Sequence, residues 1–94
     1  MGNDGSYTRK KNGTIKHYLF NRLHRIDGPA VIKSNGTQYW YQKGLLHRED
    51  GPAVIYRNGI QYWYQKGKKH CSTGPAVIRG DTEEYWINGI RIEK

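Results

Sequence analysis

The sequence predicts an all-β fold: an open, twisted, antiparallel β-meander of about four repeated hairpins in a single sheet. Three observations support this prediction. Residues that favour strands, mainly Val, Ile, Tyr and Trp, occur in short runs separated by Asn-Gly and Lys-Gly pairs. These runs recur with a period of 23 residues. No segment shows the apolar spacing of an amphipathic helix that could cover the sheet.

The repeat divides one predicted domain, residues 1–94, into four units. A degenerate hairpin spans residues 5–22, repeat 1 spans 23–45, repeat 2 spans 46–68, and repeat 3 spans 69–94 and includes a C-terminal strand. Equivalent positions carry the same residue in each full repeat, as in the series Trp40, Trp63 and Trp86. Because the chain is only about as long as one small domain, we expect a single folding unit.

In the degenerate hairpin, Asn12-Gly13 stands at the turn position and sets Tyr7 opposite Tyr18. His17 then occupies the position that Trp occupies in the later units, and it faces His24. The first hairpin is therefore expected to follow the geometry of the full repeats.

In repeats 1 and 2, Asn35-Gly36 and Asn58-Gly59 predict two-residue type I′ turns, because both residue types tolerate positive φ. Such turns fix a register in which the expected pairs are Ala30–Tyr41, Val31–Trp40, Ile32–Tyr39, Val54–Trp63 and Ile55–Tyr62. In repeat 3 the same spacing pairs Val77 with Trp86 and places Asp81-Thr82 in the turn. The Lys43-Gly44 and Lys66-Gly67 pairs predict a second set of turns, with Tyr41 opposite Leu46, Trp40 opposite His47, and Trp63 opposite His70.

Strand alternation sorts the side chains of this register into two faces. One face is expected to collect alanine, isoleucine and tyrosine side chains, which in repeat 1 are Ala30, Ile32, Tyr39 and Tyr41. The other face is expected to collect valine, tryptophan and histidine side chains, which begin with Val31, Trp40 and His47. Both faces are aromatic and nothing covers them, so the sheet is expected to pair with a second copy as a homodimer.

The segments 24–30 and 47–53 share the string His-Arg-x-Asp-Gly-Pro-Ala, which is followed by Asn-Gly and by Trp-Tyr-x-x-Gly. This string resembles a repeat of short proteins from tailed bacteriophages and giant viruses, and more loosely the MORN repeat. The resemblance covers residues 12–90 and implies a bacteriophage accessory protein, a class that often binds and blocks host machinery such as CRISPR effectors. Repeat 3 departs from the string, because it reads His70-Cys71-Ser72-Thr73.

The chain is strongly basic, since 16 Lys and Arg against 8 Asp and Glu give a formal net charge of +8. This charge favours a negatively charged partner, either a host protein or ribonucleoprotein or, as the alternative, nucleic acid. Cys71 is the only cysteine and is assigned no function, and its isolation favours a reducing compartment. No apolar run is long enough to span a membrane and the start lacks a signal-peptide segment, so we expect the host cytoplasm.

Equivalent histidines lie two strands apart in a meander, about 10 Å, which is too far to share a metal ion. Only His17 and His24 could do so, and packing on a neighbouring ring or a hydrogen bond within the turn is the favoured interpretation. We therefore predict no metal and no other cofactor.

The Arg-x-Asp-Gly-Pro segments could be read as acid–base pairs, but a structural role is favoured. In that role Asp27 and Asp50 bond to backbone amides of the turn, and Gly28 and Gly51 supply an unusual φ. Because no nucleophile, phosphate-loop or zinc-hydrolase motif is present, the protein is not expected to be an enzyme.

These observations predict a non-enzymatic binding protein, an anti-CRISPR-like inhibitor that covers a surface of a host protein or ribonucleoprotein. The alternative is a basic, aromatic sheet that binds nucleic acid or a nucleotide directly. The residues expected to contact the partner are basic turn and edge residues with two tryptophans: Arg25, Trp40, Arg48, Trp63, Lys66, Lys68 and Lys69.

Overall fold

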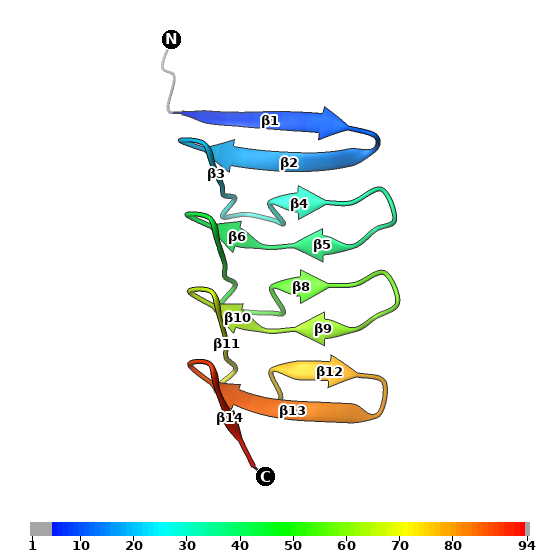
Figure 1. Ribbon diagram of the computed structural model, residues 1–94, viewed down its shortest axis with the longest axis vertical. Helices are drawn as coiled ribbons and strands as arrows, with labels where there is room; N and C mark the ends of the chain where they lie inside the picture. Colours follow the sequence, from blue (N-terminus) through cyan, green and yellow to red (C-terminus); the bar gives the residue numbers. More distant parts are fainter. Residues whose placement is uncertain (1–4, 94) are drawn as a thin grey trace.

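A computed structural model describes residues 5–93, so residues 1–4 and 94 of the predicted domain lie outside the described residues. The described chain is built from strands and turns (Figure 1). The strands are β1 (Ser6–Lys11), β2 (Thr14–Leu19), β3 (Arg22–Leu23), β4 (Val31–Ile32), β5 (Gln38–Tyr39), β6 (Tyr41–Gln42), β7 (Leu45–Leu46), β8 (Val54–Ile55), β9 (Gln61–Tyr62), β10 (Tyr64–Gln65), β11 (Lys68–Lys69), β12 (Val77–Arg79), β13 (Thr82–Ile87) and β14 (Ile90–Ile92). Within residues 5–93 there is no helix that could cross a membrane.

The main sheet is open and antiparallel, with the strand order β1-β2-β4-β5-β8-β9-β12-β13-β14 and with β3 beside β2. Two short ladders, β6–β7 and β10–β11, lie at one end of the repeats. The hairpins stack one below another from the first strand to the last (Figure 1). The predicted all-β fold with an open antiparallel sheet is confirmed.

The molecule is a thin slab of 52 × 25 × 16 Å. Its radius of gyration is 14.3 Å, whereas a compact domain of this length has a value of about 12 Å. The molecule is therefore flatter and more extended than a compact domain of the same length.

In repeats 1 and 2, the segment after the Asn-Gly turn changes its hydrogen-bonding partner at a tryptophan, from the main sheet to a separate short ladder. The N–H of Trp40 donates to the C=O of Ala53 in the main sheet at 2.7 Å, whereas the N–H of His47 donates to the C=O of Trp40 at 3.0 Å. The predicted pairings of Trp40 with His47 and of Tyr41 with Leu46 are confirmed. The meander is interrupted there, because β6–β7 forms a ladder of its own.

The first hairpin repeats this geometry with histidine in place of tryptophan. The N–H of His17 donates to the C=O of Ala30 at 2.8 Å, and the N–H of His24 donates to the C=O of His17 at 3.0 Å. Tyr7 pairs with Tyr18 across β1 and β2. The predicted equivalence of His17 to the tryptophans is therefore confirmed.

The turns of repeats 1 and 2 contain three residues rather than the predicted two. In repeat 1, the N–H of Gly36 donates to the C=O of Lys33, and the N–H of Lys33 donates to the C=O of Thr37, both at 2.9 Å. Of the central residues, only Gly36 has a positive φ, +94°, as in a type I turn followed by a bulge. The extra residue shifts the register by one.

The predicted register of the first two full repeats is consequently wrong. Val31 pairs with Tyr39 rather than with Trp40, and Val54 pairs with Tyr62 rather than with Trp63. Ile32 pairs with Gln38. Cross-strand partners share a face, so the valines join the tyrosines and the isoleucines move to the opposite face. The predicted composition of the two faces is wrong for the same reason.

Repeat 3 has a shorter turn, in which Arg79 pairs with Thr82 around Gly80-Asp81. Val77 therefore pairs with Glu84 instead of Trp86, and the predicted Asp81-Thr82 turn is wrong. The C=O of Trp86 accepts the N–H of Cys71, just as the C=O of Tyr64 accepts the N–H of Arg48. Trp86 is therefore the structural counterpart of Tyr64, not of Trp63.

The core is a narrow column of small side chains along the stacked hairpins. Its members are almost fully buried: Ala30, Val31, Ala53, Val54, Ala76 and Val77. The larger tyrosine rings beside them are only half-buried.

Candidate functional site

Arg48, one of the predicted contact residues, is occupied within the protein. Its Cζ lies 3.7 Å from the centroid of the Trp40 ring. Its Nη1 donates to the C=O of Pro52 at 3.1 Å, and its Nε lies 3.4 Å from Oδ1 of Asp50. The guanidinium thus joins repeat 2 to the ring of repeat 1.

Arg25 makes the equivalent contacts one unit earlier. Its Nη1 lies 3.1 Å from Nε2 of His17 and donates to the C=O of Pro29 at 3.2 Å. Its Nε pairs with Oδ1 of Asp27 at 3.1 Å, and this hydrogen bond is the main cause of the lowered pKa of Asp27. The Asp carboxylates therefore orient arginines, which differs from the predicted bonding to turn amides alone.

Gly28 and Gly51 do not have the positive φ that the sequence led us to expect. A Cβ on Gly51 would lie 2.7 Å from Cζ of Arg48, and a Cβ on Gly28 would lie 2.9 Å from Cζ of Arg25. Glycine leaves room there for the guanidinium, which lies against the backbone. In repeat 3 Cys71 replaces the arginine, and a Cβ on Gly74 would meet nothing within 4 Å.

The repeated histidines accept backbone hydrogen bonds from the second set of turns. Nδ1 of His24, His47 and His70 accepts the N–H of Lys43, Lys66 and Asn88 at 2.9, 2.9 and 3.0 Å. The sequence favours packing on a neighbouring ring or a hydrogen bond within the turn, whereas each observed bond joins a histidine to a turn 18–19 residues later. In residues 5–93 no three His, Cys, Asp or Glu side chains are grouped so that they could hold a metal ion.

The seven predicted contact residues do not gather on one surface. Trp40 and Trp63 lie opposite the tyrosines that flank them, and their buried indole N–H groups have no hydrogen-bond acceptor within residues 5–93. Lys66 is exposed in a turn and Lys68 is exposed on β11, whereas Lys69 lies on the tyrosine side. The prediction that these seven residues contact a partner is not tested by this placement.

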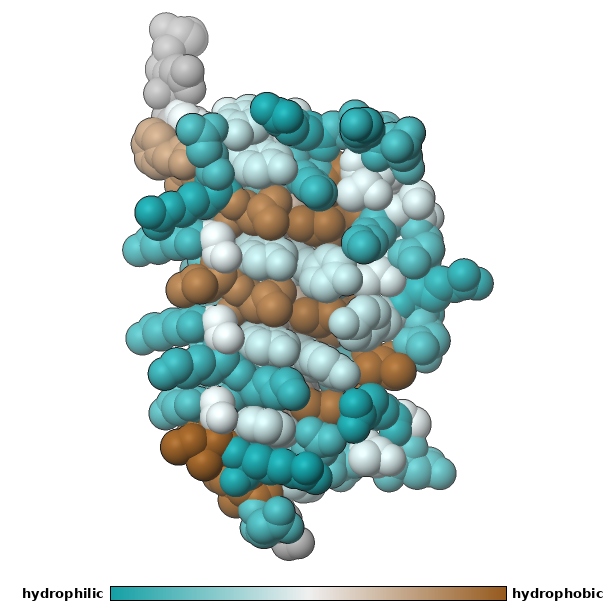
Figure 2. Space-filling view, in the orientation of Figure 1, coloured by the Kyte–Doolittle hydropathy of each residue, from teal (hydrophilic) through white to brown (hydrophobic). Residues whose placement is uncertain are grey.

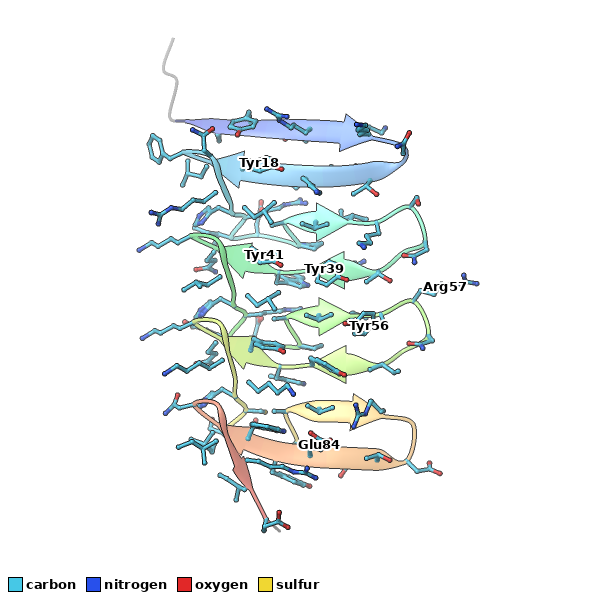
Figure 3. The ribbon with its side chains drawn as sticks, viewed as in Figure 1. Tyr18, Tyr39, Tyr41, Tyr56, Arg57 and Glu84 are labelled. Carbon is cyan, nitrogen blue, oxygen red and sulfur yellow. The ribbon has the colours of Figure 1, made fainter. Side chains whose placement is uncertain are left out.

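The opposite side of the sheet carries a continuous surface of aromatic rings, which we call the tyrosine face. It contains Tyr39, Tyr41, Tyr56, Tyr62 and Tyr64, whose neighbouring centroids lie 5.7–6.5 Å apart. Rows of pale rings alternate with brown aliphatic bands in Figure 2, and Figure 3 shows Tyr39, Tyr41 and Tyr56 on one side of the ribbon. Such an aromatic surface suits contact with another molecule.

Basic side chains surround the tyrosine face. The register places the following cations on it: Arg9, Lys11, Lys16, Lys33, Lys69, Arg79 and Arg91. Among the paired positions of this face in the described chain, Glu84 is the only acidic residue. The face therefore attracts negatively charged partners.

Two of these cations lie over rings of the face. Nζ of Lys33 is 5.7 Å from the centroid of Tyr39, and Nζ of Lys69 is 5.5 Å from that of Tyr62. Cation–π contacts of this kind hold the ammonium groups beside the rings. A partner that covers the rings would consequently meet positive charge at the same time.

Glu84 is held at the lower end of the face. Its carboxylate accepts the indole N–H of Trp86 at 3.0 Å and pairs with Nη2 of Arg79 at 2.8 Å. The Trp86 hydrogen bond is the main cause of the lowered pKa of Glu84. This negative charge is thus neutralised within the protein.

Burial, with the neighbouring rings adding to it, raises the pKa of Tyr41, Tyr56 and Tyr64. Their hydroxyl groups remain protonated in neutral solution. The face therefore offers hydrogen-bond donors as well as apolar ring surface.

The chain matches no protein-family model, curated protein or solved structure. The resemblance to phage, giant-virus and MORN repeats therefore stays a prediction.

The sequence reasoning missed the site in two respects. Alternation places the tyrosines of each repeat on one face, but the predicted contact set contains no tyrosine. Tyr56 was not assigned to either face, although it lies two residues after Val54 and so points to the same side. Listing the charged residues at every second position along each strand would have revealed the cations around this face.

Proposed function

We propose that this protein is a non-enzymatic binding protein whose tyrosine face covers an acidic surface of another protein. The observation that supports this is the row of half-buried tyrosine rings surrounded by cations, with Glu84 already paired internally. Tyrosine anchors supply contact area, and the surrounding charge speeds association with an acidic partner.

The sequence resemblance extends the proposal to the biological setting. In that setting the protein is a bacteriophage accessory protein in the host cytoplasm, and it inhibits a defence complex such as a CRISPR effector by covering a protein or ribonucleoprotein surface. A binding protein needs no catalytic group for this action, so we propose that it is not an enzyme.

The proposal is tested by affinity capture from a nuclease-treated bacterial lysate. Wild-type protein is compared with Tyr62→Ser/Lys69→Glu, which alters the face, and with Ile26→Ser/Lys68→Glu. Both pairs change the net charge equally, and Ile26 and Lys68 are exposed. A stoichiometric protein complex that is lost only with the face variant supports the proposal, and equal retention by both variants contradicts it.

Inhibition is tested separately in bacteria that carry an active CRISPR system. Expression of the wild-type protein is expected to raise the plating efficiency of a targeted phage, whereas the face variant leaves it unchanged. Circular dichroism of both variants establishes that they fold. Failure of the wild-type protein to protect the phage would contradict the inhibitor role in the system tested.

A further inference from the structure

A hollow of about 400 Å³ lies at the turn end of the first hairpin. We call it the basic hollow, and it is lined by Arg9, Lys11, Asn12, Thr14, Lys16, Tyr18 and Lys33. Its lining in the described chain thus contains four cations and no carboxylate. None of the ion pairs found in residues 5–93 includes these cations.

The strand register brings like charges together in this hollow. Arg9 pairs directly with Lys16 across β1 and β2, and Lys16 pairs with Val31 on β4, two residues before Lys33. Like charges at directly opposed positions destabilise a sheet. The cluster therefore weakens the hairpin unless an anion neutralises it.

An aromatic group accompanies the charge. Tyr18 lines the hollow and stacks on Tyr7 with a centroid separation of 4.8 Å and an interplanar angle of 8°. Arg9 lies over both rings, with its Cζ 5.7 and 6.0 Å from their centroids. Figure 3 shows Tyr18 on β2, above the row of Tyr39 and Tyr41.

The hollow is continuous with the tyrosine face. Lys33 lines the hollow and also lies over the ring of Tyr39. A chain of linked phosphates that leaves the hollow would therefore pass directly onto aromatic rings. Bases of single-stranded nucleic acid stack on such rings while cations contact the backbone.

From this combination we infer that the basic hollow binds the phosphodiester backbone of single-stranded nucleic acid. Arg9, Lys11, Lys16 and Lys33 contact phosphates, and Tyr18 with Tyr39 offers stacking surface to the bases. This inference does not depend on the protein partner proposed above. It names residues that the predicted contact set did not contain.

The test uses fluorescein-labelled dT15 and fluorescence anisotropy at several salt concentrations. The variant Arg9→Gln/Lys16→Gln removes two cations of the hollow, and Arg57→Gln/Lys68→Gln removes two exposed cations elsewhere. Figure 3 shows Arg57 projecting from its turn, away from the hollow. Both variants have the same net charge, and all four side chains are exposed, so folding should be preserved.

The hollow variant is expected to bind dT15 at least about tenfold more weakly, and its log–log salt slope should be shallower by about 1.4. The control variant should bind within about twofold of wild type with an unchanged slope. Equal weakening of both variants, or no binding by the wild-type protein, would overturn the inference. Displacement of dT15 by inorganic triphosphate at equal phosphate concentration would also overturn the assignment to nucleic acid.

The two proposals fail in different ways. Tyr62→Ser/Lys69→Glu leaves the four cations of the hollow in place, so this variant should lose the protein partner but weaken dT15 binding less than Arg9→Gln/Lys16→Gln does. Loss of dT15 binding in Arg9→Gln/Lys16→Gln with retention of the protein partner would support both proposals.

Discussion

At the scale of single residues, the Arg-x-Asp-Gly-Pro string of the repeats has a structural role. Its arginine attaches one unit to the preceding one, and we call this set of contacts the clasp. Arg48 lies on the Trp40 ring, bonds to the C=O of Pro52 and pairs with Asp50. Gly51 leaves the space that the guanidinium occupies. The Arg, Asp and Gly of the string are therefore explained by how one unit attaches to the preceding one.

The clasp predicts that Gly51 and Gly74, which occupy equivalent positions in repeats 2 and 3, differ in how well they tolerate replacement by alanine. Gly51→Ala is expected to destabilise the protein by about 1 kcal/mol, because the added methyl group displaces Arg48 from its hydrogen bonds. Gly74→Ala should be neutral or slightly stabilising, since its Cβ meets nothing within 4 Å. Urea denaturation of both variants measures the difference.

A double-mutant cycle provides the control for this prediction. If displacement of the guanidinium is the cause, Gly51→Ala should cost much less in an Arg48→Ala background. An undiminished cost in that background would show that backbone strain, not the clasp, is responsible.

His17 makes the first unit sensitive to acid. Burial, followed by the neighbouring Arg25, lowers its pKa below the ordinary 6.5. The unfolded chain then binds a proton more readily than the folded protein. The contribution of neutral His17 to the free energy of unfolding is therefore complete above about pH 6.5 and is lost as the pH falls through the lowered pKa.

Replacement of His17 by the tryptophan of the later units tests this. His17→Trp removes the titrating ring and offers Arg25 the aromatic partner that Arg48 has in Trp40. The gain in unfolding free energy over wild type should increase between about pH 8 and pH 5, measured by urea denaturation. A gain that is the same at both pH values would contradict the role of His17.

At the scale of elements, the first hairpin brings positive charges together across its two strands. Arg9 and Lys16 are direct cross-strand partners. Lys16→Glu should convert this repulsion into an attraction and stabilise the protein by about 0.5 kcal/mol. Thermal unfolding at low salt measures the gain.

Salt provides the check on the electrostatic cause of that gain. The stabilisation by Lys16→Glu should shrink at about 1 M salt, where screening acts over only about 3 Å. A gain that salt leaves unchanged would point to strand propensity instead. The same variant should lose dT15 binding, so the hairpin gains stability as the inferred site loses its ligand.

At the scale of the whole molecule, the tyrosine face combines apolar surface that favours self-association with cations that oppose it. The predicted homodimer would bring like charges together if two copies met face to face. We therefore expect a monomer at about 0.05 M salt and a dimer at about 1 M salt, where the cations are screened. Sedimentation equilibrium measures the two states.

The variant Tyr62→Ser/Lys69→Glu distinguishes this interface from others. If the tyrosine face forms the dimer, the variant should remain monomeric at high salt, whereas Ile26→Ser/Lys68→Glu should dimerise like the wild-type protein. A salt-independent dimer would mean that another surface, away from these cations, holds the copies together.

The sequence by itself determined the hairpin repeat, the all-β sheet and the equivalence of His17 with the tryptophans. These features depend on local chemistry: turn pairs that tolerate positive φ and strand-forming runs between them. Alternation also predicted that Tyr39 and Tyr41 share a face, and their rings do lie side by side although the chain changes partner at Trp40 between them.

Only the tertiary structure decided the register and the site. Asn-Gly fits both a two-residue turn and a three-residue turn with a bulge, and this one-residue difference moved Val31 beside Tyr39. In repeat 3 the shorter turn around Gly80-Asp81 displaced Trp86 from the tryptophan series. The contact of Arg48 with Trp40 and the meeting of Lys33 with the first hairpin at the basic hollow depend on how neighbouring units pack. Such contacts follow from register, which side-chain spacing alone does not fix.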